Sequence, residues 1–533
     1  MTNFDIESLS NYREHNQLEA KSAKGGFPGS FWETYSAFAN TDGGVILLGV
    51  KENPDGTLHS ENGIAISKLR KDFWNMVNNR QKISANIVTE QMVTEEVFEG
   101  NPILVVRIPR AERRAKPVFV GSDPKSGTYR RNHEGDYHCS VDEMASMFRD
   151  ASAVTQDTKV LEKMDMSVFC MNTVKGYRNF FRSKHPNHLW NNEEDEIFMR
   201  KIGAIGIGDD GKYHPTAAGL LMFGYEYEIT REFPNYFLDY QENRSLGVTR
   251  WTDRIVSTSG DWSGNIFDFV VEALRRMQQG LKTPFVLIGN QREDDTPLHK
   301  LLREALTNAV VHADFYGRQG LVVQKSEEGY KLSNPGSLRI SFKEAIDGGI
   351  SDPRNGVMLK MFSLVDFGER AGSGLNEVCT VWEKVFHTPA ILEEIHKNGV
   401  DRTILTLSNN GNKQDVGAML KLYGAECIED INDTDANRNK TIRKSEETDI
   451  NPIQNNLKPI QTDTIPIQNQ TKDAEKKNII NALRNTPTLS MDSLSRMLGI
   501  TKSSVQRRLD ALVKEGKLQH IGPSNGGSWK VTE

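Results

Sequence analysis

One stretch of the chain, residues 301 to 314, constrains the fold more tightly than any other. Apolar residues recur there at helical spacing and predict a helix with one buried face: Leu301, Leu302, Ala305, Leu306 and Ala309. Glu304 and Asn308 lie four residues apart, which places a carboxylate beside an amide on another face, and His312 extends that stripe by one turn. Such a pair can activate water and hold a hard cation, as nucleotide hydrolysis requires. The same spacing also fits an amphipathic helix whose polar face has no function.

The segment after this helix predicts two strands and two glycine turns. Residues 320 to 333 alternate as a strand pair around the charged turn Glu327-Glu328. The second strand ends in Asn334-Pro335-Gly336, and a second turn, residues 370 to 374, opens a helical run. A glycine turn that begins a helix is a place where backbone amides can meet phosphate.

In this order the elements resemble the nucleotide site of the GHKL ATPases, a fold shared by gyrase B subunits, histidine kinases and MutL-type repair proteins. A divergent bacterial branch reads Glu-Ala-Leu-x-Asn-Ala-x-x-His-x-Asp, then Asn-Pro-Gly, Arg-Asn and Gly-Ser-Gly. Those elements stand here at 304–314, 334–336, 354–355 and 372–374. The resemblance implies a helix-on-sheet domain that binds ATP and Mg²⁺.

The resemblance also implies a role for each residue. Glu304 is the expected water-activating base and Asn308 the Mg²⁺ ligand. Asn334 stands where the family usually has Asp, so its amide would accept a hydrogen bond from the adenine amino group without charge assistance. ATP binding is therefore expected rather than fast hydrolysis. The remaining cofactor-binding residues are His312, Gly336, Gly372, Ser373 and Gly374, with Arg354 and Asn355 in the lid.

Length and composition predict a multidomain globular protein. At 533 residues the chain is too long for one core, and about three to four domains are expected. No run of 18 apolar residues exists, and the first residues lack the basic and apolar regions of a signal peptide. Four scattered cysteines predict reduced thiols rather than a disulfide framework or zinc site. We expect a cytoplasmic protein without a membrane segment.

The net charge of −6 conceals two basic segments. Residues 101–131 hold eight Lys/Arg against two acids, and residues 476–533 hold ten against four. Two basic modules inside an acidic chain are typical of polyanion contact, although solvated faces can produce the same excess. The predicted nucleic-acid-binding residues of the first segment are Arg110, Arg113, Arg114, Lys116, Arg130 and Arg131.

The N-terminal segment predicts a helix from about Phe31 to Ala39, a tight turn at residues 40–44 and a buried strand at Val45–Val50. Glu14 and Glu19 precede this unit, and Lys21 follows them. These residues resemble the AlbA-like domain of Schlafen proteins. The match continues through Pro117-Val118-Phe119 and residues 127–131 and covers about residues 11 to 150.

In Schlafen nucleases, paired glutamates and a later acidic residue bind the metal that supports phosphodiester cleavage. The resemblance implies metal ligands at Glu14 and Glu19, with Lys21 beside them as a third catalytic residue. The third acid is replaced here by Lys51-Glu52, with Asp55 nearby, so binding without cleavage is favoured. The alternative without any function treats the two glutamates as surface residues with Lys21 as their ion-pair partner.

The C-terminal segment resembles a winged helix-turn-helix. Helices are expected at residues 474–484, 490–498 and 501–512, with wing strands near residues 516–519 and 529–531. Val505, Leu509 and Leu512 would face inward. The expected nucleic-acid contacts are Lys502, Ser503, Ser504, Gln506, Arg507 and Arg508. Protein docking is the alternative use of this domain.

The sequence therefore predicts a mixed α/β, multidomain protein with five regions. They are a Schlafen/AlbA-like domain (1–152), a connecting subdomain of helices and strands (153–285), a GHKL-like domain (286–410), a flexible linker (411–475) and a winged helix (476–533). The linker repeats Pro-Ile-Gln with a period of seven, which excludes a coiled coil.

The main functional hypothesis is an ATP-binding regulator of transcription or defence that binds nucleic acid, with DNA favoured over RNA. The first alternative is a metal-dependent nuclease gated by ATP, and the second is a scaffold with a degenerate nucleotide pocket. Because GHKL proteins often dimerise on ATP, the resemblance also implies a homo-oligomer. If the protein is an ATP-binding regulator, slow ATP hydrolysis is its expected enzymatic activity.

Overall fold

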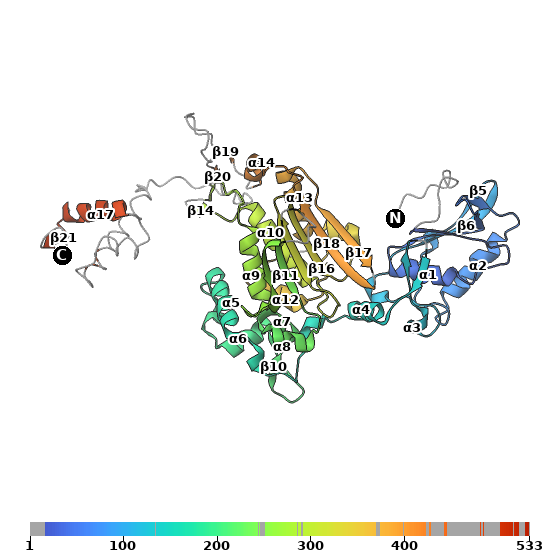
Figure 1. Cartoon of the computed structure of the whole chain (residues 1–533), viewed down its shortest axis with the longest axis horizontal. Helices are drawn as coiled ribbons and strands as arrows, with labels where there is room; N and C mark the ends of the chain where they lie inside the picture. The colour runs from blue at the N-terminus through green and yellow to red at the C-terminus, as the bar shows by residue number, and fades with distance from the viewer. Residues whose placement is uncertain are drawn as a thin grey trace, which may run out of the picture. The chain divides into compact units, whose positions relative to one another are not determined.

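The computed structural model describes residues 16–422 except 134, 244, 246–250, 285, 289–290, 369–373 and 398, together with 426–427, 442–444, 480, 483, 502–514, 516–521 and 528–531. The chain forms two compact units, Met1–Glu446 and Glu447–Glu533. Helices and strands alternate along the chain and build several separate sheets (Figure 1), which confirms the predicted mixed α/β class. Among the helices formed by the described residues, none is sufficiently long and apolar to span a membrane.

An N-terminal module, residues 16–151, is built on a four-stranded sheet in the order β1-β2-β6-β5. Strand β1 runs parallel to β2, and the other neighbours are antiparallel. The apolar strand predicted after the glycine turn is β2, which lies inside the sheet and is almost entirely buried. The bounds are β1 (Leu18–Lys21), β2 (Gly44–Leu48), β5 (Val93–Phe98) and β6 (Asn101–Ile108).

Aromatic packing holds two helices of this module together. The predicted helix is α1 (Phe31–Asn40), and Trp32 stacks on Phe73 of α2 (Ile66–Val77) with ring centroids 6.1 Å apart. Large buried aromatic side chains of this kind contribute most of the apolar area in a small core. The remaining elements are β3 (Val50–Glu52), β4 (Leu58–Ser60), α3 (Pro124–Gly127), β7 (Tyr129–Asn132), β8 (Gly135–His138) and α4 (Val141–Ala151).

The middle of the chain is mainly helical, as predicted for residues 155 to 225. Its elements are α5 (Met171–Lys184), α6 (Asp195–Ile202), β9 (Ile205–Ile207), β10 (Tyr213–Pro215), α7 (Ala217–Phe223) and α8 (Glu226–Glu232). Every residue of α7 is buried. A Cβ atom at Gly219 would lie 2.0 Å from the carbonyl oxygen of Ala204, so this helix packs closely only because a glycine stands there.

The largest sheet has six strands in the order β12-β11-β15-β16-β18-β17. Strand β11 runs parallel to β15, and all other neighbours are antiparallel. The bounds are β11 (Leu238–Asn243), β12 (Trp251–Val256), β15 (Leu321–Ser326), β16 (Gly329–Pro335), β17 (Ile391–Lys397) and β18 (Val400–Ser408). The sheet therefore begins well before residue 286, where the sequence places a domain boundary.

Helices α9 (Ile266–Met277), α10 (Pro297–Val311) and α13 (Gly374–Phe386) pack along this sheet (Figure 1), and their buried side chains form one core with it. Helix α10 begins where the side chain of Thr296 accepts a hydrogen bond from the amide of His299, with Pro297 in the first turn. All five apolar positions predicted for its inner face are buried. Two shorter helices follow β16, α11 (Phe342–Asp347) and α12 (Gly356–Ser363).

Three described elements lie inside the segment 411–475 that the sequence assigns to the linker. Helix α14 (Val416–Lys421) buries Met419 and Leu420, and Met419 belongs to the main core, so ordered structure continues past residue 410. Strand β20 (Ile442–Lys444) pairs with β13 (Val286–Ile288) in a small sheet with β14 (Gln291–Glu293) and β19 (Glu426–Cys427). At these three places short segments contact residues distant in sequence, which the composition of the segment does not indicate.

The described part of the C-terminal unit contains one helix and a hairpin. They are α17 (Lys502–Lys514), β21 (Leu518–Ile521) and β22 (Ser528–Val531), with the two strands antiparallel. Val505, Leu509 and Leu512 are buried in one cluster with Leu483, as predicted. Most of the two expected preceding helices, residues 474–484 and 490–498, lies outside the described residues.

Arginine–carboxylate pairs connect the N-terminal module to the six-stranded sheet. Both terminal nitrogens of Arg130 donate to Asp401 of β18, at 2.6 and 2.9 Å, and the arginine is 8% exposed. Burial alone would raise the pKa of Asp401, but the charge of Arg130 and the hydrogen bonds from His396 and Arg130 hold that pKa well below its usual range. This buried bidentate pair should therefore stabilise the folded unit.

We expect Asp401→Asn to lower the free energy of unfolding by about 3 kcal/mol, because the buried Arg130 guanidinium then keeps only the longer contact of 3.4 Å to the Glu143 carboxylate. In wild-type protein, a carboxyl pKa depressed by folding stabilises the native state above the unfolded pKa of about 3.9, and this contribution is lost as pH falls. Urea denaturation followed by tryptophan fluorescence measures both effects. The control Glu272→Gln breaks more exposed pairs with Arg275 and Arg276 and should cost about 1 kcal/mol or less. Equal losses in the two variants would contradict this account.

Candidate functional site

A cavity of about 900 Å³, part of it open to solvent, lies between α10, α13 and the six-stranded sheet. Strands β16, β17 and β18 and the segment 338–352 complete its wall. Apolar side chains dominate the lining and include Leu332, Ile340, Ile350, Leu375, Leu392 and Leu405.

Glu304 and Asn308 occupy successive turns of α10 and both line this cavity. The side-chain amide of Asn308 donates to Oε1 of Glu304 over 3.1 Å. This orientation leaves the amide oxygen of Asn308 available as an acceptor, since no described residue donates to it. The structure thus brings the predicted base and the predicted Mg²⁺ ligand into one polar pair at the cavity wall.

The first residue of α13, Gly374, lies directly against Glu304 and lines the same cavity. A Cβ atom at this position would stand 1.8 Å from Oε1 of Glu304, so a side chain here would displace the carboxylate. The close approach of α13 to α10 therefore requires glycine. Gly372 and Ser373 of the predicted turn lie outside the described residues.

Asn334 reaches the cavity from the end of β16 and is 6% exposed. Its amide nitrogen donates weakly to the carbonyl of Pro335 at 3.5 Å. Thr403, which pairs with Asn334 across β18, also lines the cavity, and its hydroxyl donates to the carbonyl of Gly336 at 2.9 Å. Sequence reasoning missed Thr403 because only the register of two strands distant in sequence places it there. Gly336 itself adopts φ +95° and packs against the Arg354 guanidinium rather than lining the cavity.

His312 follows α10 and also lines the cavity. Burial lowers the pKa of this imidazole to about 4, and the nearby positive charges of Arg354 and Arg339 act in the same direction. The ring is therefore neutral at pH 7 and can accept or donate a hydrogen bond without adding charge to the site.

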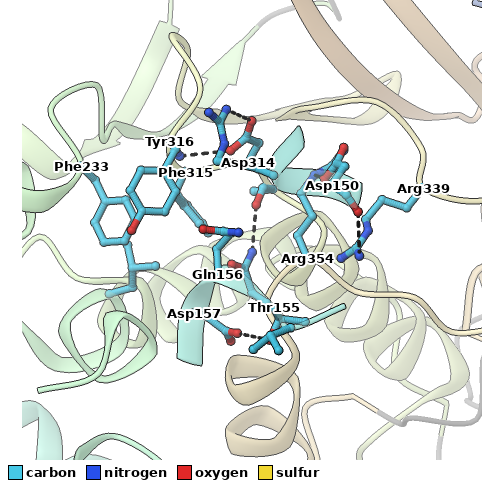
Figure 2. A pocket seen from close by; sticks show the side chains of 15 residues that line it. Asp150, Thr155, Gln156, Asp157, Phe233, Asp314, Phe315, Tyr316, Arg339 and Arg354 are labelled. Atoms are coloured by element: carbon cyan, nitrogen blue, oxygen red, sulfur yellow. Dashed lines mark hydrogen bonds and ion pairs between the residues drawn. The ribbon is translucent and has the colours of Figure 1, made fainter. Parts of the chain in front are cut away.

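Arg354 and Asn355 do not take the expected lid position. Arg354 is 6% exposed and pairs with Asp150 of α4 (Figure 2). Its Nη1 also donates to the carbonyl of His312 at 2.8 Å. The Asn355 amide donates to the carbonyls of Val311 and Ala313 at the end of α10. Neither residue lines the cavity that contains Glu304 and Asn308. Both instead satisfy the otherwise unpaired carbonyls that a helix leaves at its C-terminus.

The N-terminal acids form only part of the expected metal set. Glu14 lies outside the described residues. Glu19 accepts from Lys21 and from Arg131, each at 2.8 Å, so two cations already neutralise it. Lys21 is therefore an ion-pair partner of Glu19, as in the alternative without catalysis.

The basic residues of the N-terminal module mostly turn inward. Arg110 contacts Glu394 and Asp42, Arg113 contacts Asp352, and Arg130 contacts Asp401, as described above. Arg131 pairs with Glu19 and Asp136, and the Lys116 ammonium donates to the carbonyl of Asn40. Of the six predicted residues, Arg114 alone is exposed. This result corrects the expectation of an open basic surface, because carboxylates distant in the sequence neutralise the arginines.

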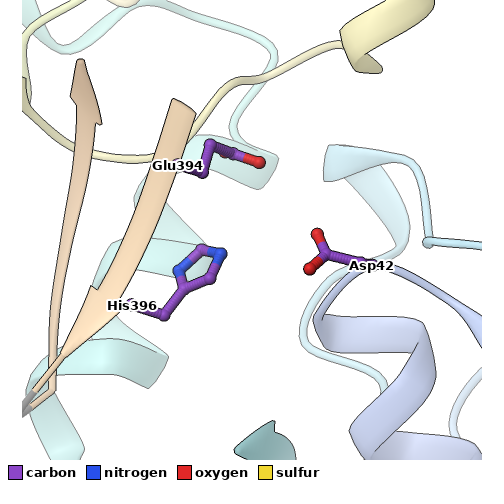
Figure 3. A group of neighbouring side chains, drawn as sticks. All are labelled: Asp42, Glu394 and His396. Carbon is purple, nitrogen blue, oxygen red and sulfur yellow. The ribbon is translucent and has the colours of Figure 1, made fainter. Parts of the chain in front are cut away.

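One group of described residues has the donor atoms of a metal site. Asp42 faces Glu394 and His396 of β17 (Figure 3), and one ligand atom from each lies within 4.8 Å of the others. Arg110 contacts both carboxylates and already supplies the positive charge that a metal ion would bring. The arrangement is therefore a charge cluster centred on arginine.

In the C-terminal unit, the predicted contact residues lie on or near the start of α17. Gln506 and Arg507 are exposed on this helix, whereas Val505 and Leu509 are buried beside them. The helix thus presents a polar face opposite its core, which is the arrangement a recognition helix needs. The side chains of Lys502, Ser503, Ser504 and Arg508 lie outside the described part of the structure.

Three parts of the chain match known protein families. Residues 14–140 match the family described as Schlafen, AlbA_2, residues 473–519 match a winged helix-turn-helix DNA-binding family, and residues 145–239 match a domain of unknown function (DUF8451). No curated protein matches the chain.

Two solved structures show limited similarity. A crystal structure of the DIP2311 protein from Corynebacterium diphtheriae is 15% identical, covers 97% of this chain and 92% of its own, and has a TM-score of 0.38. A solution structure from Nitrosomonas europaea, of the N-terminal domain of an ATP-dependent DNA helicase RecG-related protein, is 28% identical and has a TM-score of 0.20. That likeness covers 26% of this chain and 91% of the domain.

The family matches show that the chain contains a Schlafen AlbA_2 domain and a winged helix-turn-helix domain, which support a nucleic-acid-binding regulatory protein.

Proposed function

We propose that this protein is an ATP-binding regulator that binds nucleic acid and changes conformation with nucleotide occupancy. The observation that carries the proposal is that several of the expected nucleotide-site residues line one cavity. Residues far apart in the sequence line it together: Glu304 and Asn308 from α10, Gly374 from α13 and Asn334 from β16. Helix, strand, glycine turn and second helix also follow one another in the order that the GHKL resemblance implies.

The cavity suits the two chemically different ends of ATP. Apolar side chains from the sheet and from the segment 338–352 can enclose a purine ring, and Asn334 can accept a hydrogen bond from its amino group. At Glu304 the wall is polar, and the glycine at the start of α13 allows backbone amides to approach phosphate oxygens. A hard cation bound there would take oxygen ligands, which the Asn308 amide and the phosphates can supply.

Glu304 is positioned to act as a general base when nucleotide is bound. Its carboxylate is oriented by Asn308 and enclosed by Gly374, so it can accept a proton from a water molecule beside the terminal phosphate. The loss of charge at Asn334, where the related ATPases usually have Asp, weakens recognition of adenine. We therefore propose slow hydrolysis, with nucleotide binding as the main regulatory event.

The nucleic-acid part of the proposal rests on the two matched domains. In the C-terminal unit the polar face of α17 would contact DNA, in the manner of a recognition helix. Cleavage is left out of the proposal, because Glu19 already binds Lys21 and Arg131 and no observation on the described residues favours a metal there.

Asn308→Ala should weaken binding of ATP in the presence of Mg²⁺ by about tenfold, equivalent to 1.4 kcal/mol, because it removes a cation ligand. Isothermal titration calorimetry on the full chain measures this change. Asn172→Ala, an exposed position on α5, is the matched control and should bind like wild type. Wild-type affinity in Asn308→Ala would show that the site has been misplaced.

Glu304→Gln should leave ATP affinity within about threefold of wild type while abolishing hydrolysis, because a general base acts mainly in the transition state. The amide keeps the size of the side chain and can still contact Asn308. Single-turnover phosphate release compared with binding separates the two effects. Hydrolysis at the wild-type rate in this variant would exclude Glu304 as the base.

Arg507→Ala should weaken DNA binding and reduce the salt dependence of log K by about one, if its guanidinium neutralises one phosphate. Binding measured by fluorescence anisotropy over a series of salt concentrations gives both values. Lys514→Ala, at the far end of α17, is the control with the same loss of charge. A chain truncated at residue 470 that binds DNA with unchanged affinity and slope would place the interface outside the winged helix.

A further inference from the structure

A second cavity, about 400 Å³ including its open mouth, lies where the N-terminal module meets β18 and the segment 337–339. Its lining is strongly cationic and takes residues from several elements. Five basic side chains line it, Arg110, Arg113, Lys116, Arg130 and Arg339, together with only two carboxylates, Asp150 and Asp401. The four arginines already pair with carboxylates, Arg110 with Glu394, Arg113 and Arg339 with Asp352, and Arg130 with Asp401, which leaves Lys116 as the lining cation without such a partner among the described residues.

Two of these arginines are deeply buried and incompletely satisfied. Arg130 is 8% exposed, and the side chain of Arg339 is 4% exposed. Their terminal nitrogens have acceptors, but the Nε–H of each lacks a hydrogen-bond partner among the described residues. A buried donor without an acceptor has lost its hydrogen bonds to water and gained none in the protein. An oxygen atom of a ligand in the cavity could supply the acceptor that these two Nε–H groups lack.

Lys116 gives independent support, because its ammonium contacts no carboxylate in the part of the chain that the structure describes. Among the described residues, this ammonium donates one hydrogen bond, of 3.0 Å, to the carbonyl of Asn40. Burial is the main cause that lowers the pKa of Lys116 to about 7; the positive charges of Arg110 and Arg130 act in the same direction and outweigh the opposite effects of Glu394 and Asp401. The lysine therefore lies in a field of positive charge that an anion would reverse.

We propose that this cavity binds an oxyanion of the size of phosphate or sulfate, held by Lys116 and the arginines around it. Guanidinium groups present parallel N–H donors that match the oxygens of phosphate, and an ammonium adds a mobile third donor. The smaller of the two cavities suits a single phosphate group better than a whole nucleotide. The ligand is either free phosphate or the terminal phosphate of a larger molecule.

This anion site does not depend on the ATP proposal, although the two cavities share part of a wall. Leu338 and Arg339 line both of them. Asn308 belongs only to the larger cavity and Lys116 only to the smaller one. Variants at these two positions therefore test the two proposals separately.

The test titrates the full chain with sulfate, and then with inorganic phosphate, by calorimetry at constant ionic strength. Lys116→Met should weaken sulfate binding by about tenfold or more, because methionine is similar in length to lysine but has no charged donor. Lys325→Met is the matched control, since Lys325 also donates to backbone carbonyls but lies outside the cavity, and it should bind like wild type. Equal sulfate affinity in wild type and Lys116→Met would overturn the proposal, as would the absence of sulfate binding at millimolar concentration.

The dependence on pH distinguishes a ligand contact from a structural role of Lys116. Sulfate keeps its charge between pH 6 and pH 8, whereas a lysine with a pKa of about 7 loses most of its charge over this range. Wild-type affinity should therefore fall by about tenfold between these two pH values, and affinity of Lys116→Arg should stay constant. The charged groups facing Lys116 are Arg110, Arg130, Glu394 and Asp401, and His396 contacts Asp401. A pH dependence retained in Lys116→Arg would show that another group is responsible and would overturn the role of Lys116.

The source of the anion follows from competition. A short oligonucleotide with a 5′-phosphate that displaces sulfate, while its unphosphorylated form does not, would identify a nucleic-acid end as the ligand. Displacement by inorganic phosphate alone would identify the free ion, and both results support the site. Asn308→Ala should retain sulfate binding, and Lys116→Met should retain ATP binding, so failure of one proposal leaves the other measurable.

Discussion

The burial of one face of α10 against the six-stranded sheet is the interaction on which the candidate site depends. Leu301, Leu302 and Leu306 lose almost all of their solvent exposure, and full burial of such a side chain contributes about 1.5–3 kcal/mol. These apolar contacts fix the rotation of the helix about its axis, because a shift by one residue would turn every side chain by about 100°. Glu304 and Asn308 face the cavity as a consequence. The polar site is therefore positioned by residues that never touch a ligand, and α13 can close against it only through Gly374.

Charge pairing plays the corresponding role between the N-terminal module and the sheet. The basic excess of residues 101–131 predicted an exposed polyanion surface, yet three of its arginines contact Glu394, Asp352 and Asp401. Exposed ion pairs contribute little to stability, but a buried bidentate pair leaves an uncompensated charge when either partner is lost. These contacts therefore determine which surfaces meet. They also explain how a locally basic segment occurs in an acidic chain without being an open basic face.

Short-range patterns predicted the elements well, whereas contacts between distant residues could not be predicted. Helical spacing gave the buried face of α10, and alternation around a charged turn gave β15 and β16, because both patterns repeat within a few residues. Arg110 and Glu394 are 284 positions apart, and a single charged residue carries no periodic signal about its partner. The same limit explains Arg354, whose motif predicted a lid but whose guanidinium instead pairs with Asp150. Helix α14 was hidden by the polar composition around it, since Met419 and Leu420 are too few to show a period.

The segment 337–352 contacts both the N-terminal module and the cavity beside α10. The main-chain carbonyl of Leu338 accepts a hydrogen bond from Arg110, and Asp352 pairs with Arg113. Leu338 and Asp352 also line the cavity that contains Glu304 and Asn308. Movement of this segment toward a ligand in that cavity would therefore change the acceptors of two arginines in the N-terminal module. Because coupling between two binding sites is reciprocal, a partner that drew Arg110 or Arg113 away would alter the affinity of any ligand in this cavity by the same factor. Contacts from Arg110 and Arg113 thus join the N-terminal module to the segment that lines the cavity, and their ion pairs with Glu394 and Asp352 oppose separation of the two.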